Sequence, residues 1–309
     1  MTSPFGPMLV IANPAAGRGR NAVLPRLVRA LGDAGLAHQV EPTRGPGHAT
    51  ELAHAAVTQR DLRYVVAVGG DGTVHEVVNG LVDAESGQPH RDDLVLGVVA
   101  GGSGCDFIRT FGLDRSPEQV VRHLAGDTTM QIDLGRIRLT GPDGRPRTRV
   151  FANIAEAGWG AEVTRRANHL PRLLGPARYV AAIILGTTSM RQVETTVEVD
   201  HATTTEPVSE VVVANGQFFG GGLKVAPRAL PDDGRFNVQT WQSRPGDVLR
   251  ELPKVRVGEH LERPDIREWQ SSTVRVDGVE PLLVEADGEV LGTTPATFDV
   301  LPDVLAMKI

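Results

Sequence analysis

The sequence predicts an α/β protein, with an N-terminal parallel-sheet domain followed by a mainly antiparallel β domain. Strand and helix patterns alternate over the first 130 residues, and glycine-rich loops follow three of the early strands. From about residue 130 onwards, short runs of alternating polar and apolar residues dominate. Alternation of strands with helices is typical of a parallel sheet covered by helices, whereas short alternating strands are typical of antiparallel sheets.

The first part of the chain alternates predicted strands and helices. The strands are predicted at residues 8–12, 38–41, 64–68 and 94–99. Helical patterns occur between them at residues 22–34, 48–60 and 74–83. Gly35 follows the first of these patterns, and glycine is the residue type that most often ends a helix. Because helices separate these strands, we expect the strands to run parallel.

The second part of the chain has a different texture. Its predicted strands lie at residues 148–154, 194–199, 208–214, 236–241, 273–276 and 282–285. One longer helical stretch, at about residues 175–190, interrupts them. A Gly-Pro-Asp-Gly segment at residues 141–144 predicts a hairpin turn, because these residue types favour tight turns. The pattern predicts a mainly antiparallel β domain.

Composition limits the classes of protein that the chain belongs to. Its 309 residues, 40% of them hydrophobic, suit two domains or one large one. A net charge of −6 without a long basic run argues against a nucleic-acid partner. The single cysteine, Cys105, excludes an intrachain disulfide and fits a reducing cytoplasm. No signal peptide is visible, and the longest apolar run, around residues 179–186, is far shorter than the roughly 20 residues of a membrane span.

The segment 64–81, YVVAVGGDGTVHEVVNGL, is the most informative part of the sequence. Its strand-like start leads into Gly69, Gly70 and Gly72, and a helical pattern begins at Val74. Glycines let a backbone approach a ligand closely, and the N–H groups at the start of a helix favour bound phosphate. Asp71 would repel bare phosphate, which predicts a divalent cation between them. The segment predicts a nucleotide triphosphate site with magnesium, and a turn built only for tightness is the alternative.

Two further glycine-containing loops follow the same pattern. Residues 13–19 come after the first predicted strand, and residues 101–106 come after the fourth; the latter contain Asp106. Ligands of open parallel sheets bind at the carboxyl ends of the strands. We therefore expect the loops to gather at one edge of the sheet, where together they favour a phosphate site more strongly than any of them alone.

These motifs resemble the catalytic domain of the diacylglycerol kinase and sphingosine kinase family, most closely that of the soluble bacterial lipid kinases. The resemblance rests on NPAAG, GGDGTVHEVVNGL and GGSGCDFIR, and it continues in FANIAEAGWGAEV, VVVANGQFFGGGLKVAPRALPDDGRFNV and EADGEVLGTTP. It implies a nucleotide-binding α/β domain at residues 1–131 and a β-sandwich, lipid-binding domain at residues 132–296. It also implies that residues 297–309 return to the first domain, and that ATP and lipid meet between the two.

The resemblance implies which residues contact the nucleotide and the metal. The family's ATP contacts correspond to Asn13, Pro14, Ala15, Ala16, Gly17, Thr43, Gly69, Gly70, Asp71, Gly72, Thr73, Val74, His75 and Ser103. Carboxylates near the nucleotide-bound Mg²⁺ correspond to Asp71, Asp106 and Asp133. For Asp133, an ordinary aspartate at the end of a strand is the alternative.

The resemblance also implies a general base and a second metal site. Glu289, in the Asp-Gly-Glu segment, corresponds to the base that accepts the proton of the lipid hydroxyl. Without the resemblance, Glu289 would be taken for a solvated turn carboxylate. A structural Mg²⁺ corresponds to the Leu230 carbonyl, Asp233 and the Arg235 carbonyl. A turn shaped by the aspartate beside Gly234 is the alternative there.

The chain departs from the family at two loop positions. The family usually has P-x-G-T-x-N-D where this chain has Ala100, Gly102, Ser103, Cys105 and Asp106. Serine keeps a hydroxyl for phosphate, but cysteine loses the amide donors of asparagine. His75 replaces a frequent asparagine, as in the sphingosine kinase branch, and a packing or capping role is its alternative. Since every expected carboxylate is present, we expect a working kinase.

A soluble-metabolite kinase and a non-catalytic sensor are the alternatives to a lipid kinase. A soluble-metabolite kinase such as an NAD kinase shares the GGDGT loop but would lack the VAPRALPDDG and ADGE segments that are present here. A non-catalytic nucleotide or lipid sensor would be favoured by the loss of Asp71, Asp106 or Glu289, and all are present.

The identity of the lipid is left open by the sequence. Diacylglycerol, monoacylglycerol, a sphingoid base, phosphatidylglycerol and a ceramide-like lipid all carry a hydroxyl for Glu289. The apolar stretch at residues 170–190 is expected either to line an acyl channel or to form the core helix of the second domain. We expect a cytoplasmic protein that meets its lipid at the inner membrane surface. The oligomeric state stays open, a homodimer included.

Overall fold

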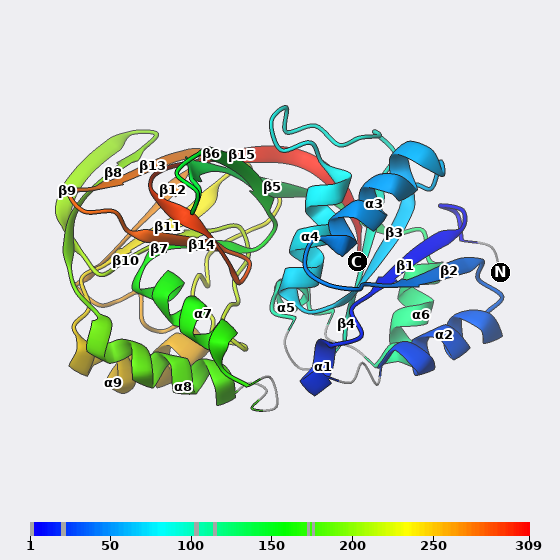
Figure 1. Cartoon of the computed structure of the whole chain (residues 1–309), viewed down its shortest axis with the longest axis horizontal. Helices are drawn as coiled ribbons and strands as arrows, with labels where there is room; N and C mark the ends of the chain where they lie inside the picture. Colours follow the sequence, from blue (N-terminus) through cyan, green and yellow to red (C-terminus); the bar gives the residue numbers. More distant parts are fainter. Residues whose placement is uncertain (1–2, 20–22, 102–104, 114–115, 172–173, 175–176) are drawn as a thin grey trace.

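The computed structural model shows two lobes side by side, joined by the last strand of the chain (Figure 1). It describes residues 3–19, 23–101, 105–113, 116–171, 174 and 177–309. The first lobe contains a parallel sheet with helices on both faces, and the second contains mainly antiparallel strands. The predicted α/β fold class, with its parallel first part and antiparallel second part, is confirmed.

Four short strands form the parallel sheet of the first lobe. They are β1 (Met8–Ala12), β2 (His38–Pro42), β3 (Tyr64–Gly69) and β4 (Val95–Ala100), and they lie in the order β4-β3-β1-β2. All five residues of β1 are apolar and buried. Continuous apolar strands of this kind are expected where helices cover both faces of a parallel sheet. The four predicted strands match these within one residue at each end.

Helices cover both faces of the parallel sheet. On one face, α3 (His48–Gln59) and α4 (Asp71–Leu81) share a core with Leu9 and Val65. On the other, α2 (Val23–Asp33) and α6 (Pro117–Ala125) share a core with Val10 and Val66. Short helices, α1 (Ala16–Gly19) and α5 (Phe107–Thr110), follow β1 and β4. Alternate residues of each strand therefore serve opposite cores, as the period of a strand requires.

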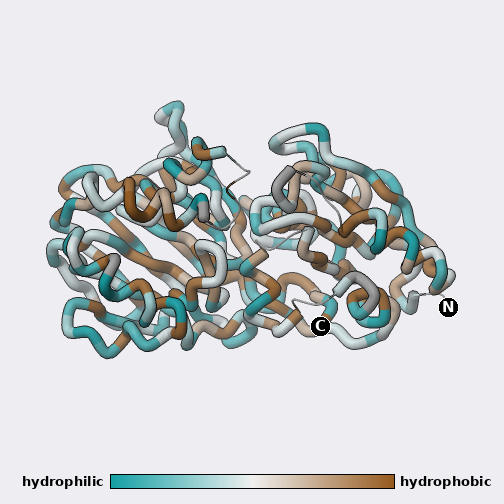
Figure 2. The backbone as a smooth tube through the Cα atoms, turned by 90° about the horizontal axis from the view of Figure 1, so that it is seen from below, coloured by the Kyte–Doolittle hydropathy of each residue, from teal (hydrophilic) through white to brown (hydrophobic). Residues whose placement is uncertain are grey.

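The second lobe is a β-sandwich. Its strands are β5 (Thr129–Thr140), β6 (Pro146–Phe151), β7 (Ile154–Gly158), β8 (Val193–Val199), β9 (Ala202–Val208), β10 (Glu210–Ala214), β11 (Phe236–Trp241), β12 (Ile266–Ser271), β13 (Thr273–Gly278), β14 (Leu283–Ala286) and β15 (Glu289–Lys308). Side chains from these strands, among them Phe151, Phe236 and Phe298, fill one core between the layers. Figure 2 shows hydrophobic residues concentrated along the strands in the interior.

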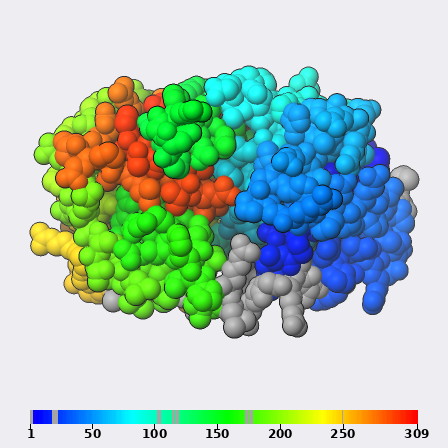
Figure 3. Space-filling view, in the orientation of Figure 1, coloured from blue at the N-terminus to red at the C-terminus, as the bar shows by residue number. Residues whose placement is uncertain are grey.

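Strand β15 links the lobes. It pairs antiparallel with β14 and β5, and near its end Ala306 lies opposite Val95 of β4 in a parallel pairing. The sheets of the two lobes are therefore continuous. Figure 3 shows this late part of the chain, orange to red, at the boundary with the first lobe.

Helices cover the outer face of one sheet of the sandwich. They are α7 (Trp159–His169), α8 (Ala177–Gly186), the short helix η2 (Thr187–Ser189) and α9 (Pro245–Val257). Helix α8 falls within the predicted helical stretch, whereas α7 and α9 are not predicted from the sequence. Among the described residues, no helix is long and apolar enough to cross a membrane.

Three predicted boundaries are wrong. The strand predicted at residues 208–214 spans the last residue of β9 and the whole of β10. Helix α4 begins at Asp71 rather than at Val74, because Gly70 in an extended conformation caps it. The strand predicted at residues 148–154 is two strands, β6 and β7. The chain breaks between them because the amides of Ala152 and Asn153 donate to the carboxylate of Asp287. The predicted turn at residues 141–144 does join the hairpin of β5 and β6.

Candidate active site

The glycine-containing loops meet at the carboxyl edge of the parallel sheet. The amide of Asn13, after β1, donates to the Val68 carbonyl at 2.9 Å. The amide of Gly101, after β4, donates to the Gly69 carbonyl at 2.8 Å. Loops that follow neighbouring parallel strands β1, β3 and β4 thus lie side by side. This is the edge at which such sheets bind ligands.

A side-chain hydrogen bond connects the loops that follow β1 and β3. The Asn13 side chain accepts from the Ala15 amide at 2.9 Å and donates to the Thr73 hydroxyl at 3.3 Å. Pro14 and Ala15 lie between β1 and α1, and Ala16 and Gly17 begin that helix. Thr43 follows β2, where its amide donates to the Ala12 carbonyl. Val74 and His75 are buried in α4, and Ser103 lies outside the described residues.

Asp71 connects the second loop to the third. Its two carboxylate oxygens accept from the backbone amides of Asp106 and Phe107 at 3.1 and 2.9 Å. The Asp71 carboxyl group is closely surrounded by protein atoms, and the residue as a whole is half-buried. Burial, together with the negative charge of Asp106, raises the pKa of Asp71 to about 8. A cation placed between these carboxylates would offset their repulsion.

Asp106 faces the second lobe. One of its oxygens accepts from the Gly221 amide at 2.7 Å, and the other lies 3.1 Å from Nε of Arg109. Burial raises the pKa of Asp106 despite this arginine. Asp71 and Asp106 supply carboxylate oxygens, the ligands that Mg²⁺ prefers, and phosphate oxygens commonly complete such sites. The donor set therefore fits Mg²⁺.

His75 of α4 bridges the lobes. Its Nδ1 atom lies 3.1 Å from an Asp287 oxygen, and its Nε2 atom lies 3.8 Å from an oxygen of Glu289. Burial by itself lowers the pKa of His75, but the hydrogen bond and charge of Asp287, helped by Glu289, outweigh it and leave the pKa raised. A protonated His75 attracts both carboxylates, so it holds the Asp-Gly-Glu turn against the first lobe.

Asp287 fixes the turn that carries Glu289. It is 2% exposed, and its carboxylate also accepts from the amides of Ala152, Asn153 and Ile154 at 2.9 to 3.3 Å. Its φ angle of 50° is unusual for a residue other than glycine. By contrast, the Glu289 side chain is 43% exposed. The turn is thus rigid at its base and presents a reachable carboxylate.

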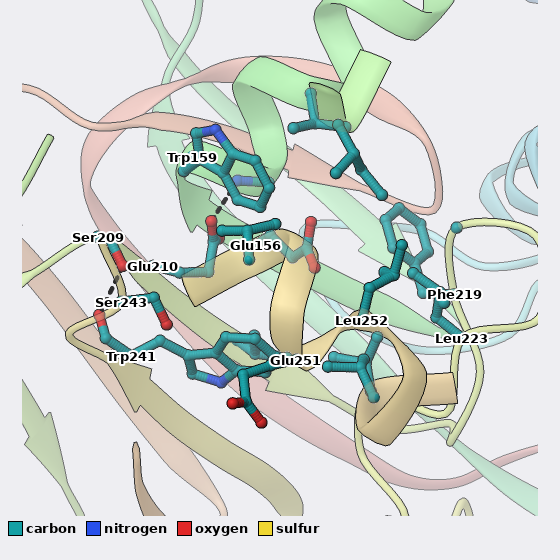
Figure 4. A pocket seen from close by; sticks show the side chains of 18 of the residues that line it. Glu156, Trp159, Ser209, Glu210, Phe219, Leu223, Trp241, Ser243, Glu251 and Leu252 are labelled. Carbon is teal, nitrogen blue, oxygen red and sulfur yellow. Dashed lines mark hydrogen bonds between the residues drawn. The ribbon is translucent and has the colours of Figure 1, made fainter. Parts of the chain in front are cut away.

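An apolar cavity of about 100 Å³ opens in the second lobe, between the sheet and helices α7, α8 and α9. Trp159, Trp241 and Phe219 contribute most of its aromatic surface (Figure 4). Tyr179 of α8 also lines the cavity. Burial raises the pKa of its phenol most, the charge of Glu285 comes next, and the nearby charges of Asp71 and Asp106 raise the pKa further. Tyr179 therefore lies between the cavity and the two aspartates of the first lobe.

The second metal site is expected in the loop at residues 230–235. The Asp133 carboxylate accepts from the Gly234 amide at 2.7 Å and the Asp303 amide at 2.9 Å, so Asp133 lies beside the 230–235 loop. Asp233 is exposed and accepts from the Arg235 amide at 3.0 Å. In the described part of the chain, no group of three or more His, Cys, Asp or Glu side chains is placed to hold a metal. One carboxylate with the carbonyls of Leu230 and Arg235 would be an oxygen site of the kind that Mg²⁺ accepts.

Replacement of Asp233 by alanine tests this site. If a cation binds only the native loop, Mg²⁺ without nucleotide should raise the melting temperature of the parent protein but not of Asp233→Ala. Asp143→Ala is a matched control, because Asp143 accepts from Arg145 two residues ahead at 3.1 Å in the same way. Thermal melts with and without Mg²⁺ would measure the difference. Equal shifts in all three proteins would remove Asp233 from the metal site.

Family models match almost the whole chain. The diacylglycerol kinase catalytic domain model matches residues 7–137. The model described as the YegS C-terminal NAD kinase beta sandwich-like domain matches residues 153–309, half of the chain. The chain belongs to the diacylglycerol kinase family. Membership of this kinase family implies a phosphotransferase that uses ATP.

Individual relatives agree with the family. A diacylglycerol kinase of Mycobacterium tuberculosis (strain H37Rv) is 28% identical over 310 residues, covering 97% of this chain and 94% of the relative. One from Bacillus subtilis (strain 168) is 28% identical over 297 residues, covering 94% and 91%. The crystal structure of a diacylglycerol kinase from Bacillus anthracis str. Sterne has the same fold, with a TM-score of 0.71 at 19% identity, covering 99% and 97%.

The structure brings most of the residues expected at the kinase site to one place. Asn13, Asp71, Thr73, His75, Asp106 and Glu289 are linked by the contacts described above, directly or through their loops. The sequence did not single out Asp287 as an anchor, nor Arg109 and Tyr179 as neighbours of the carboxylates. The Asp-Gly-Glu motif was the only local signal for Asp287, since its partners lie more than 130 residues away.

Proposed function

We propose that the protein transfers the γ-phosphoryl group of ATP to the hydroxyl of a diacylglycerol-like lipid, with Mg²⁺ and with Glu289 as the general base. The observation that carries the proposal is the position of the Glu289 turn. His75 holds the turn against helix α4 on one side, and on the other side Gly288 of the turn lies near Tyr179, which lines the apolar cavity of the second lobe. A lipid hydroxyl and a terminal phosphate would meet there.

The chain's own groups divide the work of the reaction. Glu289 accepts the proton of the lipid hydroxyl, and the hydroxyl oxygen forms a bond to the γ-phosphorus while the bond to the β,γ-bridging oxygen breaks, leaving ADP. Backbone amides of Gly70, Asp71 and Gly72, at the start of α4, orient the phosphates, whereas the Thr73 amide donates to the Gly70 carbonyl. Asp71 and Asp106 would hold Mg²⁺, which supplies neutralisation of the phosphate charge. His75 and Asp287 keep Glu289 in position.

Helix α8 supports delivery of the substrate from a membrane surface. Val180, Ile184 and Leu185 are 46%, 49% and 51% exposed, an unusual display of large apolar side chains on one helix. On the inner side of the helix, Tyr179 and Ile183 line the cavity. We infer that α8 rests on the lipid surface and that acyl chains enter beneath it. The cavity is smaller than the ~300–1,000 Å³ typical of ligand pockets, so entry requires outward movement of α8.

Phosphate transfer from γ-labelled ATP tests the proposal directly. The protein would be mixed with micelles of diacylglycerol, monoacylglycerol or a sphingoid base, with NAD, or with buffer alone. Label in a lipid product, identified by mass spectrometry, is the expected result. Label in NAD only, or in nothing but released phosphate, would contradict a lipid kinase. Lipid extracted from the purified protein would identify the class of substrate independently.

Binding of the nucleotide should release a proton near neutral pH. In the unliganded protein, the pKa of Asp71 at about 8 leaves this side chain mostly neutral at pH 7. A bound cation favours the ionised form, so Mg²⁺–ATP should displace close to one proton, and affinity should rise between pH 6 and pH 8. Calorimetry in two buffers of different ionisation enthalpy would count the protons. Asp71→Asn, which has no proton to lose there, should abolish the release at saturating nucleotide.

A further inference from the structure

Three buried glutamates lie together on the outer face of the sheet in the second lobe. Glu285 of β14 is opposite Glu156 of β7, and Glu210 of β10 is opposite Gly158, two residues further along β7. They are 0%, 6% and 4% exposed, respectively. The residues next to them in these strands, such as Ala157 and Ala286, pack into the sandwich core. The glutamates therefore point the other way, towards helix α7 and the cavity.

These three carboxyl groups are not ion-paired within the part of the chain that the structure describes. Among the residues that the structure describes, no lysine, arginine or histidine forms an ion pair with any of them. Glu156 and Glu285 lie opposite each other on neighbouring strands, so the negative charge of Glu156 opposes the ionisation of Glu285. Burial raises the pKa of Glu156 to about 7 and raises those of Glu210 and Glu285 well above their ordinary value. The cluster is therefore largely neutral and offers O–H donors.

The cluster also has unused hydrogen-bonding atoms. The Gly160 amide donates to Oε2 of Glu210, and the Gly288 amide donates to Oε2 of Glu285, but Oε1 of each has no hydrogen-bond partner among the described residues. Around the same cavity, the buried hydroxyls of Thr164 and Ser243 also have none. A buried polar group without a hydrogen-bond partner is destabilising, so a ligand that supplies the partner would be favoured. Figure 4 shows Glu156, Glu210 and Ser243 at the wall of the apolar cavity.

The geometry points to the polar part of a glycerolipid as the partner of these groups. We propose that Glu156, supported by Glu210 and Glu285, donates a hydrogen bond to an ester carbonyl oxygen of the lipid and so directs its free hydroxyl to Glu289. An ester carbonyl can only accept a hydrogen bond, so its partner here would be a protonated glutamate. An ammonium group only donates, so it would need an ionised glutamate instead. The glutamate cluster lies near Glu289, because the amide of Gly288, the residue before Glu289, donates to the Glu285 carboxylate. This assignment rests on the proposed lipid-kinase function and narrows its substrate to esters.

Several titratable groups surround Glu156 and bear on its protonation. They are Glu210 on β10, Glu285 on β14, Asp287 after it, Tyr179 on α8, Glu251 on α9 and Arg263 after α9. Arg263 pairs with Asp265, and Glu251 pairs with Lys254 at 3.0 Å. The uncompensated neighbours are therefore acids, which oppose the ionisation of Glu156. Raising the pH through neutrality should remove the Glu156 proton and with it the donor.

Intrinsic fluorescence gives a binding assay that needs no nucleotide. Trp159 and Trp241 line the cavity, and Trp269→Phe removes the remaining tryptophan. Dioctanoylglycerol would be titrated into this background below its micelle concentration, alongside its diether analogue, which lacks both carbonyls. We expect the diester to bind at least about tenfold more tightly at pH 6.5, worth about 1.4 kcal/mol. Its affinity should fall about tenfold by pH 8.5.

Variants separate the carbonyl contact from simple packing. Glu156→Gln keeps an N–H donor, so it should retain the preference for the diester and lose the pH dependence. Glu156→Leu, which has no donor, should bind both lipids alike. Glu251→Gln is the matched control: this glutamate lines the same cavity but is ion-paired, and its replacement should change neither property. Thermal melts would confirm folding, and Glu285→Gln is a second test of the cluster if Glu156→Gln is unstable.

The outcomes distinguish this inference from the proposed function. Equal affinities of the parent for diester and diether would overturn the carbonyl contact even if lipid phosphorylation is observed. So would tighter binding of a long-chain amino alcohol as pH rises, because that result requires ionised carboxylates. Ester-selective binding without any phosphate transfer would keep the carbonyl contact and reject the kinase.

Discussion

Replacement of Glu289 by glutamine is expected to lower kcat for the best lipid by about 10²- to 10⁴-fold, the usual effect of losing a general base. Glutamine has nearly the same shape and keeps a hydrogen bond to the substrate, but it cannot accept a proton at neutral pH. The affinity for ATP should hardly change, because the nucleotide is expected on the first lobe. Single-turnover kinetics with labelled ATP would separate the two properties.

A second glutamate provides the control for this experiment. Glu280 lies before β14, whereas Glu289 follows that strand at its other end, and Glu280 is 58% exposed beside Arg191. Glu280→Gln should therefore leave kcat unchanged. Normal turnover by Glu289→Gln would remove this carboxylate from the reaction. A comparable loss in His75→Asn would indicate that the contact through Nε2, at 3.8 Å, is needed to hold Glu289.

The meeting of the three glycine-containing loops at one edge of the parallel sheet could be predicted from the sequence, because that edge is built from local signals. Strands β1, β3 and β4 are short apolar runs, and glycines follow each of them. Parallel pairing of such strands brings their carboxyl ends together without further information. The hydrogen bonds from Asn13 to Val68 and from Gly101 to Gly69 are the result of that geometry.

The second lobe was less predictable because its site depends on distant contacts. Glu156 and Glu285 alternate with apolar residues in their strands, a pattern that normally predicts a solvated face. That face is covered by α7 and α9, and neither helix was anticipated. The break between β6 and β7 likewise depends on Asp287, more than 130 residues later in the chain. Periodicity describes one segment at a time, so it cannot show which face another segment covers.

Replacement of Gly72 by valine is expected to abolish useful binding of ATP while the protein still folds. Gly72 is in the first turn of α4, between Asp71 and Thr73, and a Cβ atom built there has none of the described neighbouring residues within 4 Å. The side chain would extend towards the N-terminal end of the helix, where phosphate is expected, because Cβ atoms tilt that way. A loss of about 100-fold or more in affinity, near 2.8 kcal/mol, is the expected result.

Variants of two other glycines, Gly246 and Gly69, serve as controls for Gly72→Val. Gly246 is the second residue of α9, as Gly72 is of α4, and it also has open space around it. Gly246→Val should therefore carry the same helical cost without affecting ATP. Gly69→Ala differs from both, since its new carbon would lie 2.2 Å from the Thr73 hydroxyl and should destabilise the fold. Calorimetric titration with Mg²⁺–ATP, beside thermal melts, would compare all three. Parent-like affinity in Gly72→Val would mean that phosphate binds elsewhere, because the valine side chain would occupy the space at the start of α4 in which phosphate is expected.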